Sequence, residues 1–142
     1  MAKLKYACVL TRNLPGLAAF YREVLQADPQ LTGPYAEFPT GLGTFCLWSE
    51  DAYTEVAGAR ALPAQGTGRT MLEFEVDDVD AEFLRLQELA EFEVDFILPP
   101  TTMTWGNRSI YFRDPDSNLV NLFSHVGSPE QQDDGENSHA NR

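Results

Sequence analysis

The chain has 142 residues and a mass of 15.9 kDa, which suits one folded domain of common size. Hydrophobic residues make up 43% of it and aromatic residues 11%, enough for a packed core and too many for a wholly disordered chain. The 22 Asp and Glu outweigh 10 Lys and Arg, and the resulting net charge of −12 would repel phosphate, which excludes non-specific nucleic-acid binding.

The chain also lacks the patterns of a membrane or secreted protein. No apolar run approaches the length that crosses a bilayer, and the N-terminal stretch MAKLKYACVL has no long apolar segment of the kind found in secretory signals. We therefore expect a cytoplasmic protein with no membrane partner. Cys8 and Cys46 follow no metal-binding spacing. In a reducing compartment we expect two buried free thiols, with a disulfide between them as the alternative.

The first predicted elements are a strand and a helix. The apolar run over 5–10 is typical of a strand. Asn13 is suited to cap a helix, and Pro15 falls in the first turn, where its missing N–H costs nothing. Helical spacing then predicts one apolar stripe, made of Leu14, Leu17, Ala18, Tyr21 and Leu25. The helix must end near Pro29.

Two more strands follow, and then a segment without a clear period. The stretches 35–38 and 44–48 are expected as strands on either side of a turn over 39–43. Segment 49–69 mixes Gly, Pro, Ala and polar residues, so we expect a connecting loop.

The same order of elements then begins again. Residues 70–76 alternate apolar and polar side chains as a strand does, and Asp78 takes the capping role of Asn13. The stripe of the second helix consists of Val79, Phe83, Leu86 and Leu89. After it we expect strands over 94–98, 109–112 and 119–124, with a break at Pro99-Pro100 and a turn over 114–118.

This internal duplication sets the domain organisation. Neither half could bury its own sheet face, so the two halves must pair. We expect a single domain over 1–126, made of modules 4–48 and 70–126 joined by the loop 49–69. The polar segment 127–142 is expected to be a disordered acidic tail.

Three stretches occur in a characteristic order: NLPGLAAFYREVL (13–25), LEFEVDDV (72–79) and WGNRSIYFRDPDSN (105–118). Together with the doubled pattern they resemble the vicinal oxygen chelate superfamily over about residues 4 to 126. That superfamily includes glyoxalases, extradiol dioxygenases, fosfomycin-resistance enzymes and bleomycin-resistance proteins. The resemblance implies an α+β fold in which tandem βαβββ modules form a partly open, curled mixed sheet with helices packed outside.

Strand alternation sorts the side chains within such a fold. Ala7, Val9 and Thr11 would face the first helix, and Leu72, Phe74, Val76, Val120 and Leu122 would pack in the second half. The side chains expected to face the cavity are Tyr6, Cys8, Leu10, Cys46, Trp48, Met71, Glu73, Glu75, Asn121 and Phe123.

The resemblance also allows a test for a metal site. Metal-dependent members hold their ion with His, Gln or Glu at four positions. Counted from the residues that open the helices and from the turn over 114–118, those positions are Tyr6, Met71, Asn121 and, less directly, Cys46. Tyr6, Met71 and Asn121 are poor ligands for a divalent ion, so we expect no metal and no cofactor.

These departures shift the expected function towards binding. In the bleomycin-resistance type, two chains form a dimer and flat cationic drugs lie in clefts lined by aromatic and carboxylate side chains. We therefore expect a non-catalytic homodimer that sequesters a cationic or aromatic small molecule, with antibiotic resistance as one form of that role. No residue is predicted to be catalytic. The predicted ligand-binding residues are Tyr6, Cys8, Tyr35, Glu37, Cys46, Trp48, Met71, Glu73, Trp105, Arg108, Tyr111, Asn121 and Phe123.

Three other functions stay open from the sequence. The chain is a metal-dependent lyase or dioxygenase if carboxylates such as Glu37, Glu73 and Glu75 replace the usual ligands. It is a metal-free enzyme if Tyr6 or a carboxylate performs the chemistry, and a partner-binding module if it has no cavity.

The sequence also predicts roles for three residues of the third stretch. Arg108 is expected either to contact an anionic part of a ligand or to form an ion pair with Glu73 or Glu75. Trp105 lies at the cavity mouth or anchors its loop. Ser117 stands where the family has Gly, which predicts a turn with little need for a positive φ.

Overall fold

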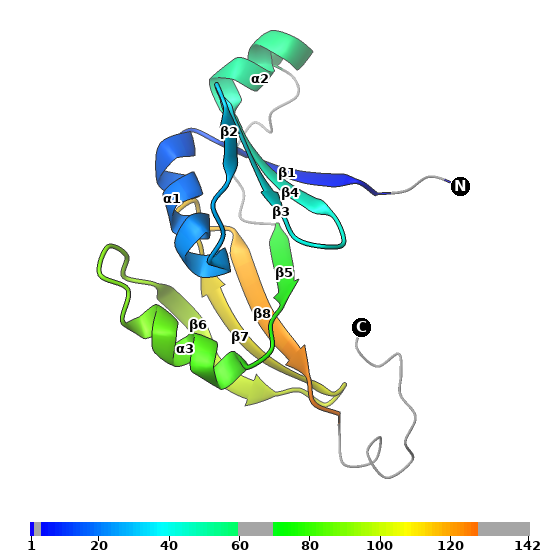
Figure 1. Cartoon of the computed structure of the whole chain (residues 1–142), viewed down its shortest axis with the longest axis vertical. Coiled ribbons are helices and arrows are strands. Elements are labelled where there is room, and N and C mark those ends of the chain that lie inside the picture. The colour runs from blue at the N-terminus through cyan, green and yellow to red at the C-terminus, as the bar shows by residue number, and fades with distance from the viewer. Residues whose placement is uncertain (2–3, 60–69, 128–142) are drawn as a thin grey trace. The chain divides into compact units, whose positions relative to one another are not determined.

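The computed structural model describes residues 1, 4–59 and 70–127. The chain forms two compact units, Met1–Thr67 and Gly68–Arg142. Each unit contains one four-stranded mixed sheet (Figure 1), in the order β1-β4-β3-β2 in the first (sheet 1) and β5-β8-β7-β6 in the second (sheet 2). The same strand order therefore occurs twice, and the predicted duplicated α+β fold is confirmed.

Unit 1 begins with the predicted strand and helix. Its elements are β1 (Tyr6–Thr11), α1 (Leu14–Leu25), β2 (Gln30–Thr32), β3 (Tyr35–Pro39), β4 (Thr44–Ser49) and α2 (Glu50–Ala57). Asn13 caps α1 as predicted, because its side chain accepts a hydrogen bond from the Gly16 N–H at 3.1 Å. The helix α1 buries Leu17, Ala18, Phe20, Tyr21 and Val24 against sheet 1, so Phe20 and Val24 take the buried places expected for Leu14 and Leu25, which are half-buried.

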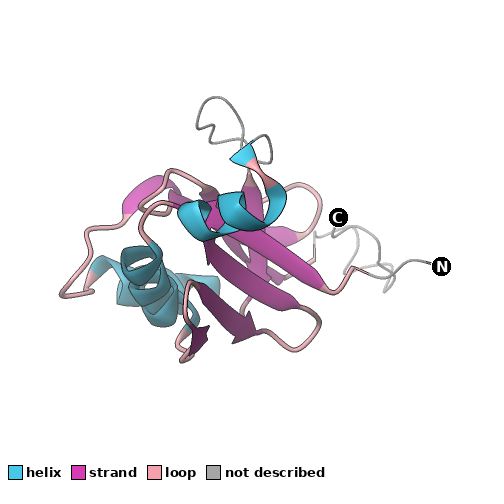
Figure 2. Cartoon of the chain, turned by 90° about the horizontal axis from the view of Figure 1, so that it is seen from above, coloured by secondary structure: helices cyan, strands magenta, loops and turns pink. Residues whose placement is uncertain are grey.

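Unit 2 repeats this arrangement with a shorter helix. Its elements are β5 (Met71–Glu75), α3 (Val79–Gln87), β6 (Asp95–Thr102), β7 (Asn107–Arg113) and β8 (Leu119–His125). Asp78 caps α3 by accepting from the Ala81 N–H at 3.1 Å. The helix packs on β6, β7 and β8, where Ile110, Phe112, Val120 and Leu122 are fully buried. The strands of both sheets are magenta in Figure 2 and the helices cyan.

Alternation places most side chains as predicted, although Ala7, expected to face α1, is exposed. In sheet 1, Val9 and Thr11 are buried, and Phe45 packs edge-to-face on Tyr21 of α1 with ring centroids 4.8 Å apart. In β5, Leu72 and Phe74 are half-buried, whereas Met71, Glu73 and Glu75 are exposed. One face of each sheet therefore covers its helix and the other carries the side chains expected to form a site.

Segment 49–69 is not wholly the loop we expected. Ser49 caps the helix α2 by accepting a hydrogen bond from the Ala52 N–H. The negative charges of Glu50 and Asp51 in the first turn stabilise the positive end of the helix dipole. The apolar period of this short helix is too weak to reveal it, but its cap and acidic first turn are visible in the sequence. Residues 60–69 lie outside the described part of the chain.

Sheet edges account for two other differences. The three-residue strand β2 lies between two prolines and was not predicted. Pro99 and Pro100 do not break their strand, because β6 is the last strand of its sheet and runs through them with shifts of register. Proline is tolerated at an edge, where no neighbouring strand needs its N–H. The helix α3 ends at Gln87, so Leu89 is not part of its stripe.

The turn before β8 corrects the expectation for Ser117. Its φ is 70°, so the turn keeps the left-handed conformation although a serine occupies the position. The Asp114 carboxylate imposes this geometry, since its Oδ1 accepts from the N–H groups of Asp116 and Asn118 at 2.9 and 2.8 Å. The turn predicted over 114–118 is confirmed, and the side chain of Asp114 holds it.

We expect Ser117→Gly to raise the free energy of unfolding by about 0.5–1 kcal/mol, because glycine adopts a positive φ without steric cost. Urea unfolding followed by circular dichroism measures the change. Ser124→Gly in β8 is the matched control and should destabilise, since that serine has no positive φ. Equal effects of the two substitutions would contradict the assignment of strain to Ser117.

The C-terminal tail and the possibility of a membrane-spanning helix were also considered in the sequence. Apart from Gly127, the predicted tail 127–142 lies outside the described residues. Among the residues that the structure describes, none of the helices has the length and apolar character needed to cross a bilayer.

Candidate functional site

The face of sheet 1 opposite α1 gathers five of the predicted site residues. We call it the α1-distal face and define it by Cys8, Tyr35, Glu37, Cys46 and Trp48. Strand register aligns Cys8 with Cys46 and Cys46 with Glu37, and it aligns Trp48 with Tyr35. Residues paired across neighbouring strands point to the same side of a sheet. Register thus brings together side chains that are distant in sequence. Both cysteines are free, but only Cys46 is buried, so the expectation of a buried thiol is wrong for Cys8.

A chain of hydrogen bonds links three of these side chains. The Tyr35 hydroxyl lies 2.8 Å from Glu37 Oε1 and 3.0 Å from Cys46 Sγ, and Cys8 is next to Cys46 in register. A carboxylate only accepts, so the single Tyr35 proton goes to Glu37. The Tyr35 oxygen can then accept from the Cys46 thiol, which also lies 3.9 Å from the Thr44 carbonyl oxygen.

This arrangement keeps the thiol and the phenol protonated. Desolvation is the largest cause that raises the pKa of Cys8 from 9.0 to about 12, followed by its hydrogen bond to Cys46 and the nearby charges. Desolvation also raises the pKa of Tyr35, and its bonds to Cys46 and Glu37 add to this rise. Neither group is therefore a thiolate nucleophile or a phenolate base at neutral pH.

We expect Cys8 to react with iodoacetamide about 30-fold more slowly than a free cysteine near about pH 8. The rise in pKa lowers the thiolate fraction roughly a thousandfold. The higher nucleophilicity of a more basic thiolate restores about 30-fold of that loss. The rate should keep rising with pH until the pH nears this raised pKa. Peptide mapping by mass spectrometry measures it.

The controls for this reaction are two glutamate variants. Glu37→Gln removes a negative charge that raises the Cys8 pKa, so it should speed alkylation. Glu23→Gln on the exposed side of α1 should leave the rate unchanged. Wild-type alkylation at the rate of a small free thiol would contradict the hydrogen-bonded chain.

Aromatic rings continue the α1-distal face towards α2. The Trp48 ring lies 4.9 Å from that of Tyr35 and 5.4 Å from that of Tyr53, measured between centroids. Trp48 and Glu37 are half-buried, so parts of both remain accessible to solvent. Tyr53 is absent from our sequence prediction because α2 was not recognised. The Ser49 cap is the signal that could have placed it beside Trp48.

The face of sheet 2 opposite α3 carries different side chains. Asn121 lies between Glu73 and Tyr111 in register, and its Nδ2 donates to Glu73 Oε1 at 2.9 Å. This bond fixes the amide orientation because the carboxylate accepts only. Asn121 is 2% exposed, and its Oδ1 has no hydrogen-bond partner. The Oγ of the buried Ser109 also has none. Phe123, half-buried, pairs with Ser109 in the next row.

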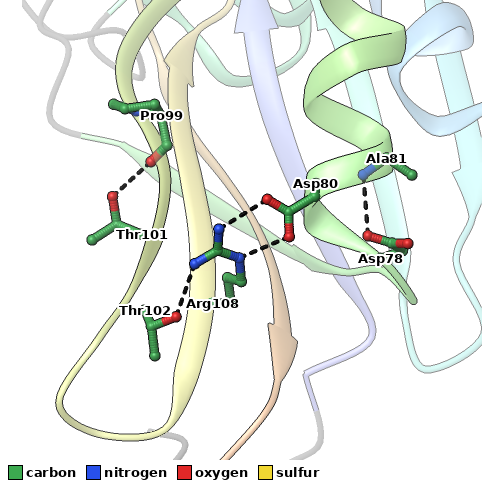
Figure 3. A network of polar contacts seen from close by, with 7 residues as sticks. All are labelled: Asp78, Asp80, Ala81, Pro99, Thr101, Thr102 and Arg108. Carbon is green, nitrogen blue, oxygen red and sulfur yellow. Dashed lines mark hydrogen bonds and ion pairs between the residues drawn. The ribbon is translucent and has the colours of Figure 1, made fainter.

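Arg108 does not pair with either glutamate that we proposed. Its Nε and Nη2 bind the two Asp80 oxygens at 2.8 and 2.9 Å, and Nη1 contacts Thr102 Oγ1 at 2.9 Å (Figure 3). Arg108 has the same strand parity as Ile110 and Phe112, so it points towards α3, whereas Glu73 bonds to Asn121 on the other side. The hydrogen bonds from Arg108 lower the pKa of Asp80.

Three predicted site residues are largely exposed. Tyr6 is 54% exposed, Met71 45% and Trp105 42%. Trp105 lies in the turn between β6 and β7, where Gly106 has a φ of 97° and donates its N–H to the Met103 carbonyl. The ligand-binding roles of Tyr6, Met71 and Trp105 therefore remain predictions.

The residues at the family's metal positions do not fit a divalent ion. Tyr6 and Met71 offer a phenol and a thioether, and Asn121 offers an amide that is bonded to Glu73. The Cys46 thiol is buried and hydrogen-bonded. Across the described ranges, no three His, Cys, Asp or Glu side chains come together as metal ligands. We therefore derive no chemical step through a divalent metal.

Comparison with known proteins identifies the family. Residues 4–126 match the family model of the glyoxalase-like domain. The chain is 30% identical to the uncharacterized protein YraH of Bacillus subtilis (strain 168) over 91 residues, which are 63% of this chain and 70% of YraH.

Solved structures with this fold agree. A glyoxalase/bleomycin resistance protein/dioxygenase from Nocardioides is 25% identical and has a TM-score of 0.73, over 91% of this chain and 88% of its own. A glyoxalase/bleomycin resistance protein/dioxygenase family enzyme from Burkholderia phytofirmans PsJN shares the fold at 20% identity, with a TM-score of 0.75 over 88% and 100% of the two chains. The chain therefore belongs to the glyoxalase-like domain family, within the vicinal oxygen chelate superfamily.

Proposed function

We propose that this protein binds a flat, cationic small molecule and sequesters it without chemical change. The observation that carries the proposal is the α1-distal face. There Trp48 lies between the rings of Tyr35 and Tyr53, and the Glu37 carboxylate accepts a hydrogen bond from Tyr35. The names of the Nocardioides and Burkholderia proteins include bleomycin resistance, which is consistent with this class of ligand.

The physical chemistry of this face suits a cation with an aromatic body. Ring faces attract a cation with about 0.5–2 kcal/mol each, and the half-buried Glu37 adds an opposite charge. The net charge of −12 also raises the local concentration of cations around the protein. Such a face would favour a cationic ligand over a neutral one of the same shape.

The protonation states of the face support binding rather than catalysis. A general base must have a pKa near the working pH, whereas the pKa values of Cys8 and Tyr35 are raised far above neutrality. The family's metal positions hold residues that do not suit a divalent ion. Cys8 and Tyr35 therefore keep their protons and can serve as hydrogen-bond donors.

We expect N-methylacridinium to bind at least about 10-fold more tightly than acridine, which is uncharged at about pH 8. The two molecules share their aromatic body and differ in charge. Isothermal titration calorimetry measures both affinities, and chromatography of the recovered compound shows whether it has been changed. Trp48→Ala should weaken binding of the cation about 10-fold to 30-fold.

Matched glutamate variants separate the role of the face from that of the overall charge. Glu37→Gln should weaken N-methylacridinium binding by about 10-fold, whereas Glu23→Gln, which removes the same charge from α1, should not. Equal affinity for acridine and N-methylacridinium would contradict the proposal. So would turnover that a chelator abolishes and one equivalent of a divalent metal restores, because that result indicates a metal-dependent enzyme.

A further inference from the structure

We infer that Cys8 and Cys46 form a two-thiol site for a soft, monovalent d10 cation such as Cu(I) or Ag(I). This site goes beyond the proposed function, because it does not require that the face bind an organic cation.

Strand register places the two thiols for shared coordination. Cys8 and Cys46 are direct partners on the neighbouring parallel strands β1 and β4, so their side chains point to the same side of sheet 1. They are the only cysteines of the chain. Two thiols held on a rigid sheet can bind one ion together, without ordering a loop.

The number and type of ligands select the ion. Zinc and similar ions require three or four protein ligands, and the described residues bring no such group together. Soft thiolates prefer ions such as Cu(I), and a d10 monovalent ion is satisfied by two of them. The buried Cys46 shields one ligand from water, while the exposed Cys8 gives the ion a route of entry.

The Tyr35 hydroxyl can stabilise the charge that results and so offset part of the repulsion from Glu37. Binding breaks two S–H bonds and forms two S–metal bonds, and the two protons pass to solvent with no change of oxidation state. A coordinated thiol loses its proton outright, so the raised pKa of the free thiol does not prevent coordination. Once Cys46 is a thiolate, the Tyr35 hydroxyl, 3.0 Å from its sulfur, can donate to it.

Silver is the probe that avoids oxidation and reduction. We expect the reduced full chain to bind one equivalent of Ag(I), measured by native mass spectrometry and by titration against a competing thiol. X-ray absorption of the bound silver should show two sulfur ligands. Cys8→Ser should weaken binding at least about 100-fold, because it leaves a single thiol and removes the gain from paired ligands.

The controls keep the test decisive if a variant fails to fold. Cys46 is buried and its substitution can unfold the unit, whereas Cys8 is exposed, so Cys8→Ser decides the result. Met103→Leu removes a thioether sulfur from unit 2 and should leave the affinity unchanged. Unaltered affinity in Cys8→Ser overturns the inference, as does silver held by one sulfur. Neither result bears on N-methylacridinium binding, so the two proposals fail separately.

Discussion

Tyr21→Ala is expected to lower the free energy of unfolding by about 3–5 kcal/mol. Tyr21 has no exposed surface and packs edge-to-face on Phe20 and Phe45, with centroid distances of 5.3 and 4.8 Å. Its loss leaves a cavity between α1 and sheet 1 that the surrounding side chains can fill only in part. Urea unfolding followed by circular dichroism measures the change.

A second variant on the same helix shows whether the effect comes from packing. Glu23→Ala is exposed and should change the free energy of unfolding by no more than about 0.5 kcal/mol. The α1-distal face depends on this packing, because α1 covers the other side of the strands that carry it. A loss below about 1 kcal/mol for Tyr21→Ala would contradict the helix-to-sheet contact.

Asp114→Ala is expected to lower the free energy of unfolding by about 2–4 kcal/mol. The carboxylate is 4% exposed and accepts from the N–H groups of Asp116 and Asn118 and from Asn118 Nδ2 at 2.9, 2.8 and 2.8 Å. The substitution leaves buried donors without partners and frees a turn that holds Ser117 at a positive φ.

The geometry of this carboxylate predicts a graded series. Asp114→Asn keeps an oxygen for both backbone N–H groups but loses the acceptor for Asn118 Nδ2, so we expect a loss of about 1–2 kcal/mol. Asp116→Ala, on an exposed side chain of the same turn, should lose less than about 1 kcal/mol. Thermal unfolding ranks the three variants, and equal losses at Asp114 and Asp116 would contradict the assigned hydrogen bonds.

Local signals in the sequence were enough to predict most of the fold. Asn13 and Asp78 mark the starts of α1 and α3 because their side chains satisfy free N–H groups, and that chemistry is local. The expected break at Pro99 fails because the position of a strand within its sheet decides whether proline is tolerated, and that position is not local. The prediction for Ser117 is wrong for a different, local reason, since the Asp114 carboxylate of the same turn holds Ser117 at a positive φ.

The site was predicted to the level of which face each side chain occupies. Alternation correctly separated Cys8, Cys46 and Trp48 from the residues beneath α1, because that pattern has a period of two along each strand. Register across strands is not visible in one sequence, so the contact between Cys46 and Tyr35 could not be foreseen. The pairing of Arg108 with Asp80 depends on how α3 lies over β7, which is equally hidden.

Nuclear magnetic resonance titration of the isotope-labelled chain with N-methylacridinium tests the central claim most directly. We predict saturable shifts of the backbone amides of Glu37 and Cys46 and of the Trp48 indole N–H, with the ligand recovered unchanged. Saturable shifts confined to α1 or to unit 2, or a ligand converted to product, would contradict the assignment of binding to the α1-distal face.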